Sequence, residues 1–260
     1  MIYLKYISMS FQKAIAYRFE YFASLLNAFL YIFIFITLWK TLLKEKTNLP
    51  FTSEQMTAYV IIAMVIKTIF PRNEGFLTTK VRTGEIAVDL MKPYSLAIIF
   101  FSDTIGLFLY QILSKGFPIF LVSYFLFGIS FSFDGVVLLK FFLLFGLSFL
   151  IHLFISLLIS SLSFFFTETF PFWIVYLSLT TLFSGAIIPL DFFPEGMKDL
   201  ILLTPFPYLF YYPTLVLVKS QSFTNFGDIL ISYLVQATIL FLLSYSLYRL
   251  GLRKLTIAGG

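Results

Sequence analysis

Two side chains of the types that perform acyl transfer lie one helical turn apart. His152 and Ser156 are four residues apart, so a helix places them on the same face. A serine nucleophile also needs a third group that orients the base and a site for the oxyanion, and neither is recognisable here. An intramembrane hydrolase is therefore a minor alternative, and a hydrogen-bonded core histidine is the ordinary interpretation of His152.

The residue types that bind metals, nucleotide phosphates or nucleic acids are scarce. The chain has no cysteine and one histidine, so thiolate centres, disulfides and multi-histidine metal sites are excluded. It lacks the Gly-x-x-x-x-Gly-Lys-Ser/Thr loop that cradles ATP. The net charge of +5 forms no basic stripe with interleaved aromatics. We expect no cofactor bound by this chain and no nucleic-acid partner.

The composition is that of a protein whose main solvent is lipid. Hydrophobic residues make up 60% of the 260 residues and charged residues 12%, against roughly 25% charged in soluble domains. The apolar runs are continuous and about twenty residues long, without the alternation of a barrel strand. The sequence predicts an all-α integral membrane protein with one transmembrane domain over residues 1–260.

Six membrane spans are expected. They cover residues 21–39, 52–70, 116–129, 136–163, 172–188 and 229–248. Thr52 and Gln55 form a capping box for the second span, and Pro71 stops it. Asp103, Gln111 and Lys115 interrupt the apolar run before the third span. We therefore interpret residues 96–114 as partly interfacial or buried in protein.

The distribution of basic residues predicts the orientation. With the N-terminus inside, twelve of the eighteen Lys and Arg residues lie in inner segments and six in outer ones. This places both termini and residues 71–95 in the cytoplasm. Residues 1–18 have Lys5, Ser8 and Gln12 on one helical side, opposite Leu4, Ile7, Phe11 and Ala14. The pattern predicts an amphipathic interfacial helix, with a frayed tail as the alternative.

Residues 185–220, before the last span, combine apolar stretches with an unusual density of proline. Half of the ten prolines lie between residues 185 and 213. The apolar pieces 200–203 and 208–212 are too short to cross a bilayer. We interpret the region as a re-entrant helical hairpin in the outer leaflet, because broken backbone at membrane depth must be received by protein or water. An ordinary extracellular loop is the alternative.

The most strongly charged element between spans is the segment 79–93. Thr83 is a plausible N-cap, with Gly84 beginning the helix and Glu85 in its first turn. Glu85 and Asp89 then share one face, and Ile86 and Leu90 share another. A helix of two turns is too short to be stable alone, so we expect it to dock on a partner. The alternative is a solvated cytoplasmic loop.

Polar side chains within spans are candidates for a substrate path because they are costly in lipid. These are Asn27, Lys67, His152 and Gln236. Asn27 equally suits a bond between helices. Asp103 is the one acidic residue between 96 and 128. A secondary transporter or stand-alone channel has little support, since no inverted repeat is visible.

The order of elements and four short motifs resemble the permease subunits of type-2 ATP-binding-cassette exporters. The motifs are Arg82-Thr-Gly-Glu85 with Leu90-Met-Lys-Pro93, Ser184-Gly185 with Pro189-Leu-Asp-Phe-Phe-Pro194, Pro205-Phe206 with Pro213, and Gly259-Gly260. The resemblance covers essentially the whole chain. Lys219-Ser-Gln departs from the pattern, which has a glycine after the Pro213 segment.

The resemblance implies an export permease of the bacterial cytoplasmic membrane with an unidentified amphiphilic or hydrophobic cargo. Residues 80–93 would be the coupling helix that fits a cytosolic ABC ATPase dimer, which would bind the ATP and Mg²⁺. The implied coupling residues are Arg82, Gly84, Glu85, Ile86, Asp89, Leu90, Lys92 and Pro93. The implied outer gate is Pro189, Phe192, Phe193 and Pro194. The second permease would be another copy or a paralogue.

Overall fold

The computed structural model describes residues 2–15, 18–44, 49–128, 134–219 and 225–255, which form helices and no strand within those ranges. The α-helices are α1 (Ile2–Ile15), α2 (Arg18–Lys44), α3 (Ser53–Ile69), α4 (Phe76–Thr83), α5 (Glu85–Leu90), α6 (Leu96–Gln111), α7 (Phe117–Phe127), α8 (Gly135–Ser161), α9 (Phe170–Phe183), α10 (Glu195–Leu202), α11 (Pro207–Val218) and α12 (Phe226–Lys254). A π-helical turn, η1 (Ile112–Gly116), joins α6 to α7, and η2 (Leu162–Phe164) and η3 (Leu190–Phe192) are 3₁₀ turns.

Four helices are long and apolar enough to cross a membrane. They cover residues 21–44, 96–127, 135–164 and 226–254. The pair α10 and α11, bent by 112°, passes the same criteria jointly, as a broken span or a re-entrant loop. α3 has 17 residues and α9 has 14. The described residues are therefore all-helical, with four to five candidate spans.

Residues 96–114, which we interpreted as partly interfacial or buried in protein, do not form an element separate from the third span. Residues 96–127 form one continuous apolar helix of 32 residues, through the π-helical turn. Asp103 does not interrupt it, because its carboxylate accepts hydrogen bonds from Ser10 and Asn73. The third candidate span thus begins at Leu96, not near Gly116.

The boundaries of the other helices agree with the sequence to different degrees. Thr52 and Gln55 form the expected capping box at α3, which ends at Ile69 just before Pro71. The expected fifth span extends too far, because α9 ends at Phe183. The last helix is longer than expected and continues to Lys254.

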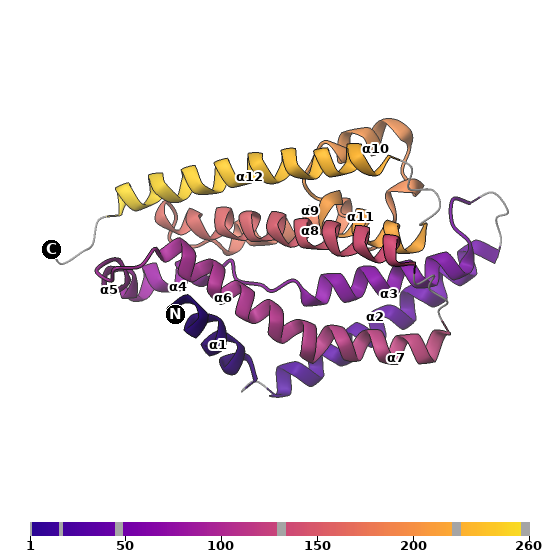
Figure 1. Cartoon of the computed structure of the whole chain (residues 1–260), viewed down its shortest axis with the longest axis horizontal. Helices are drawn as coiled ribbons and strands as arrows, with labels where there is room; N and C mark the ends of the chain where they lie inside the picture. The colour runs from indigo at the N-terminus through magenta and orange to yellow at the C-terminus, as the bar shows by residue number, and fades with distance from the viewer. Residues whose placement is uncertain (1, 16–17, 45–48, 129–133, 220–224, 256–260) are drawn as a thin grey trace.

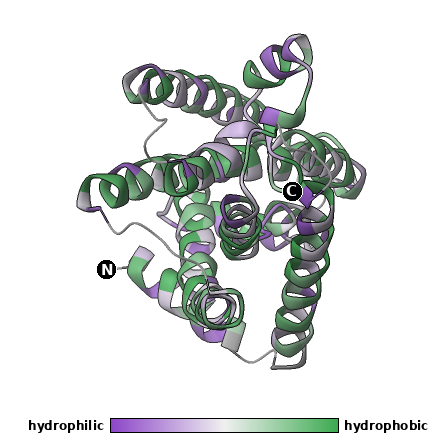
Figure 2. Cartoon of the chain, turned by 90° about the vertical axis from the view of Figure 1, so that its right-hand side faces the viewer, coloured by the Kyte–Doolittle hydropathy of each residue, from purple (hydrophilic) through white to green (hydrophobic). Residues whose placement is uncertain are grey.

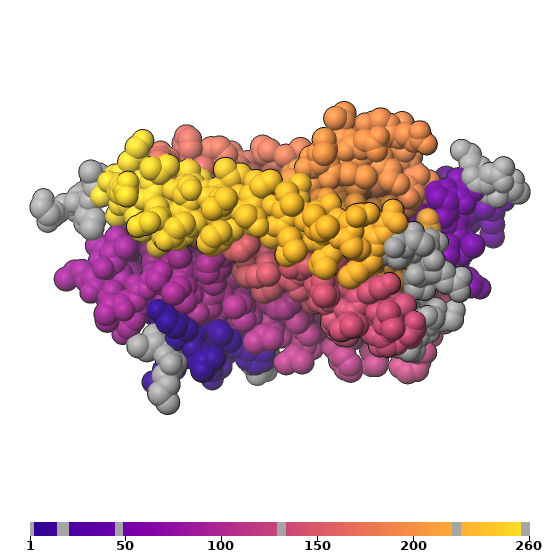
Figure 3. Space-filling view, turned by 45° about the horizontal axis from the view of Figure 1, so that its top comes forward, coloured from indigo at the N-terminus to yellow at the C-terminus, as the bar shows by residue number. Residues whose placement is uncertain are grey.

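The helices run roughly side by side, and one end of the molecule holds α1, α4, α5 and the last turns of α12 (Figure 1). The bent hairpin α10–α11 lies toward the other end, beside the start of α12 (Figures 1 and 3). Hydrophobic residues predominate along the long helices (Figure 2). Exposed Phe22, Leu26 and Phe33 on α2 are examples. Such surfaces suit contact with lipid.

α3 is the central helix of the bundle. Eleven of its side chains are buried, and it contacts α2, α11, α7 and η1. α8 packs against α11 and α12. On the surface, α1 crosses α6 at Gly106, where an added Cβ would lie 2.9 Å from the Ser10 Cβ and would also clash with the Ile7 carbonyl oxygen. Only glycine permits this close crossing.

Candidate functional site

The charged segment forms a corner between two short helices. Gly84 has φ +76°, a left-handed conformation that ends α4 and precedes α5. Thr83 belongs to α4, and its hydroxyl donates to the Thr79 carbonyl oxygen at 3.0 Å. The expectation that Thr83 caps a helix beginning at Gly84 is therefore wrong. Glycine in this conformation ends a helix, and Lys80 and Arg82 in the last turn of α4 suit its negative end.

Asp89 holds the corner closed. Its carboxylate is bound by the Lys80 ammonium from α4 and, at 2.7 Å, by the Lys92 ammonium. Burial acts to raise the pKa of Asp89, but the hydrogen bonds and charges of the two lysines outweigh burial and lower it. The Asp89 side chain is 7% exposed, whereas Glu85 is exposed. The expected acidic face shared by Glu85 and Asp89 does not form.

We expect Asp89→Asn to loosen α5 from α4. Losing a charged partner of two lysines costs about 1.5–3 kcal/mol, so amide hydrogen exchange in α5 should speed up at pH 7. Because the fold lowers the pKa of Asp89, its stabilisation is complete at neutral pH and is lost as pH falls through that pKa. In acid, the variant and the wild type should show the same amide exchange rates in α5. Glu85→Gln is the control and should leave exchange unchanged; equal exchange in all three chains would contradict the role of Asp89.

The apolar side chains of the corner divide into a buried anchor and an exposed edge. Ile86 is 3% exposed and packs in a cluster with Leu77 and Phe100. The exposed edge consists of Val88, Leu90 and Met91, which are 60%, 40% and 87% exposed. Sequence reasoning named Leu90 but missed Met91. The sequence feature that could have identified Met91 is its spacing of three residues from Val88, which places both side chains on one side of the last helical turn.

The remaining coupling residues lie on the surface around this edge. Arg82 pairs with Glu168 at 3.1 Å, and both side chains are more than half exposed. Such a pair contributes little stability. Gly84 and Pro93 are exposed and Lys92 is partly exposed. The corner therefore exposes the apolar side chains of Val88, Leu90 and Met91 together with the charged Arg82, Glu85 and Lys92.

Hydrogen bonds tie the segment that precedes the corner to the long helices. The Asn73 amide donates to Thr104 on α6 at 2.8 Å and to Asp103 at 3.1 Å. The Leu77 backbone N–H donates to the Ser160 hydroxyl of α8 at 3.1 Å. A displacement of the corner must therefore strain or break contacts to both α6 and α8.

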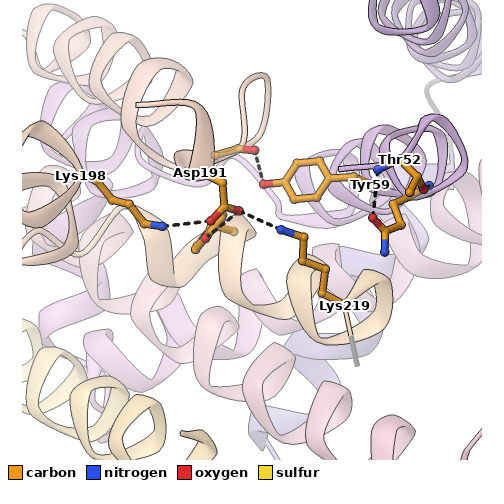
Figure 4. A network of polar contacts seen from close by, with 8 residues as sticks. Thr52, Tyr59, Asp191, Lys198 and Lys219 are labelled. Carbon is orange, nitrogen blue, oxygen red and sulfur yellow. Dashed lines mark hydrogen bonds and ion pairs between the residues drawn. The ribbon is translucent and has the colours of Figure 1, made fainter. Parts of the chain in front are cut away.

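At the other end, Asp191 organises the expected outer gate (Figure 4). Its carboxylate accepts from Lys198 at 2.9 Å and from the Tyr211 hydroxyl at 3.1 Å, and lies 3.7 Å from the Lys219 ammonium. The Tyr59 hydroxyl of α3 donates to the Gly185 carbonyl oxygen at 2.6 Å. Sequence reasoning missed Asp191 although it lies between two expected gate residues.

The four expected gate residues differ in their surroundings. The Phe192 ring lies 4.8 Å from the Trp39 ring and 5.8 Å from the Phe51 ring. Pro189 is buried, Phe193 is partly buried and Pro194 is exposed. Phe192 thus packs η3 against the C-terminal part of α2.

Comparison with models of protein families shows to which family the chain belongs. A model described as an ABC-2 family transporter protein matches residues 13–259. The chain belongs to this family. A search among curated proteins found no match. The ABC-2 chain is thus a multi-pass membrane permease, the transport subunit of an ABC transporter, and the family implies a partnership with an ATP-binding subunit.

The four polar residues expected along a substrate path in this ABC-2 chain have separate environments. Asn27 is exposed on α2, and the Lys67 ammonium lies 5.5 Å from the Tyr31 ring. The Gln236 amide donates to the Leu203 carbonyl oxygen at 2.8 Å. The described structure gives them no common hydrogen-bond partner, so it does not assemble them into one site.

His152 is bonded to the backbone just after the C-terminal end of α3. Its Nε2 lies 2.8 Å from the Pro71 carbonyl oxygen. Within the described residues, no hydrogen bond joins it to Ser156. A serine nucleophile needs that bond to its base. The geometry thus favours a core histidine over a hydrolytic pair in this ABC-2 subunit.

Proposed function

We propose that this chain is the permease subunit of an ABC exporter that moves an amphiphilic or hydrophobic cargo across the bacterial cytoplasmic membrane. A separate ATPase dimer, with ATP and Mg²⁺, drives it through the corner of α4 and α5. The observation that carries the proposal is the exposed apolar edge Val88, Leu90 and Met91 on a chain of the ABC-2 family. An exposed apolar patch set in polar surroundings marks an interaction site.

The arrangement of the helices supports a cytoplasmic position for this edge. α4 and α5 lie at the same end as α1 and the last turns of α12 (Figure 1). That end carries Arg249, Arg253 and Lys254 of α12, as the positive-inside rule requires of a cytoplasmic face. Both termini are cytoplasmic in this proposal, and α1 lies in the membrane surface.

The proposal counts six spans. α3 has 17 residues, which at about 1.5 Å per residue give about 26 Å, close to the thickness of the hydrocarbon core. α9 supplies the fifth crossing together with the segment that follows it. The bent pair α10–α11 is then the re-entrant hairpin of the outer leaflet. A second copy of the chain, or a paralogue, completes the translocation path.

We expect Val88→Asp with Met91→Asp to abolish retention of the ATPase. Two carboxylates would meet an apolar groove, and an unpaired charge buried at an interface costs several kcal/mol. The ATPase that copurifies with the tagged chain from native membranes should fall at least tenfold, while the permease elutes as the wild type does. Retention at the wild-type level would refute the proposal.

Two further variants separate binding from stability. Met197→Asp changes another exposed methionine, on α10 at the opposite end, and should leave ATPase retention intact. Ile86→Asp places a charge in the buried cluster and should lower the yield of folded permease. Transport by the purified chain alone, driven by an ion gradient, would instead support a secondary transporter.

A further inference from the structure

A cavity of about 720 Å³ lies at the inner end of the molecule. Its walls come from α1, the start of α2, the segment from Arg72 to Lys80, and α6. Figure 3 shows α1 at the surface, next to the α4–α6 part of the chain. A volume of this size accommodates a small organic molecule or a lipid headgroup with the first part of its chains.

Cations outnumber carboxylates in the wall. Lys13, Arg72, Lys80 and Lys115 line the cavity, against Asp103 and Glu85. Asp103 already accepts from Ser10 and Asn73, so its charge is partly satisfied. Lys80 is bound to Asp89. Lys13 has no ion-pair partner among the described residues. The Arg72 guanidinium forms no ion pair there either, but it lies 5.4 Å from the Trp173 ring and its charge acts on the Glu74 carboxylate. A ligand would therefore meet two cations from different elements, of which Arg72 is already positioned by an aromatic ring.

Neutral hydrogen-bond donors and an apolar margin complete the cavity. The Tyr6, Tyr21 and Tyr110 side chains also line it, and tyrosine is the side chain typical of the headgroup level of a bilayer. Apolar residues on the elements that form the walls are strongly exposed, with Met9 63% and Phe22 66% exposed. A ligand with an anionic head and apolar chains would contact both the basic wall and the apolar margin, whereas a free phosphate would contact only the basic wall.

We propose that this cavity binds the phosphate headgroup of an anionic phospholipid of the inner leaflet. Lys13 and Arg72 contact the phosphate, the tyrosines surround the glycerol region, and the acyl chains lie along α2 and α6. A basic pocket between membrane helices on the cytoplasmic side is suited to such a headgroup. Its placement in the inner leaflet rests on the orientation given in the proposed function, whereas binding of the lipid does not depend on an ATPase.

The position of the cavity gives the lipid an influence on the corner of α4 and α5. Gly75, Thr79 and Glu85 form part of its wall. A bound lipid therefore contacts the surface helix α1 and the corner at once. Occupancy favours whichever arrangement of these elements keeps the wall closed around the headgroup.

The test uses the purified full-length chain in nanodiscs of phosphatidylglycerol and phosphatidylcholine. Native mass spectrometry should find one tightly retained phosphatidylglycerol per chain, enriched at least tenfold over phosphatidylcholine. Lys13→Glu with Arg72→Glu should lose this lipid. Lys5→Glu with Arg253→Glu, which changes one exposed lysine of α1 and one arginine of α12 outside the cavity, should keep it.

Three outcomes overturn the proposal. The first is a wild type without phosphatidylglycerol enrichment, and the second is equal lipid loss in both double variants, which would mean diffuse surface charge. The third is complete displacement by millimolar glycerol phosphate, which would assign the cavity to a soluble phosphate. If the glutamate variant does not fold, Lys13→Gln with Arg72→Gln takes its place, and retained lipid in that variant also refutes the site.

Discussion

Asp191→Asn is expected to open the hairpin of α10 and α11. The change leaves the Lys198 and Lys219 ammonium groups, 30% and 17% exposed, without their carboxylate. Breaking a buried ion pair costs about 3–5 kcal/mol, and partial exposure reduces this to about 2 kcal/mol. Local opening should therefore become about thirtyfold more frequent. The Tyr211 hydroxyl also loses its charged acceptor.

The absence of cysteine makes this opening directly measurable. Ser184, the C-cap of α9, is fully buried beside Gly185, so Ser184→Cys gives a nearly isosteric thiol just before the hairpin. Its maleimide labelling rate should rise about thirtyfold in the Asp191→Asn background. Asp199→Asn removes a neighbouring exposed carboxylate and should not change the rate. Equal labelling in both backgrounds would show that Asp191 does not hold the hairpin.

Gly106→Val is expected to lift α1 from α6. The added Cβ clashes with the Ile7 carbonyl oxygen and lies 2.9 Å from the Ser10 Cβ, so backbone must move. Overpacking costs about 1–3 kcal/mol, and more where a backbone atom blocks relaxation. The hydrogen bond from Ser10 to Asp103 would be lost with the contact. Exchange of the α1 amides should increase tenfold or more.

Gly146→Val is the matched control for this change. Gly146 also lies within a membrane helix, but an added Cβ has nothing within 4 Å. Hydrogen exchange followed by mass spectrometry should therefore show normal protection of α1 in Gly146→Val. If Gly106→Val also keeps α1 protected, the close crossing does not hold that helix.

α3 and the corner of α4 and α5 show which features local sequence determines. The capping box of Thr52 and Gln55 and the stop at Pro71 need only neighbouring residues, and both predictions are confirmed. Glycine occurs both where a helix begins and where a helix ends. The prediction that Gly84 begins a helix left out Lys80 and Arg82, which suit the last turn of a helix that ends there. Asp89 is buried because Lys80, nine residues earlier, reaches across the corner. Helical periodicity cannot predict this contact, because the two residues lie on different helices.

Tertiary partners also explain the error in the third span. Asp103 and Gln111 suggested an interface, but polar groups are tolerated inside a bundle when other helices satisfy them. With its amide nitrogen turned toward α3, Gln111 donates to the carbonyl oxygens of Thr68 and Ile69. At the outer end, Pro189 and Phe192 were found by resemblance, whereas Tyr59 and Tyr211 reach the same place from distant helices. The spacing of these residues along the sequence does not show that their side chains lie close together in space.

The π-helical turn Ile112–Gly116 places the two halves of one long helix out of phase. A single extra residue turns every later side chain by about 100° relative to an uninterrupted α-helix. α6 faces α1, and α7 faces α2 and α3. The two halves of the helix thus present different faces to their neighbours, and both also contact α3. The helix over residues 96–127 thus packs against α1 before η1 and against α2 and α3 after it, on faces that point in different directions.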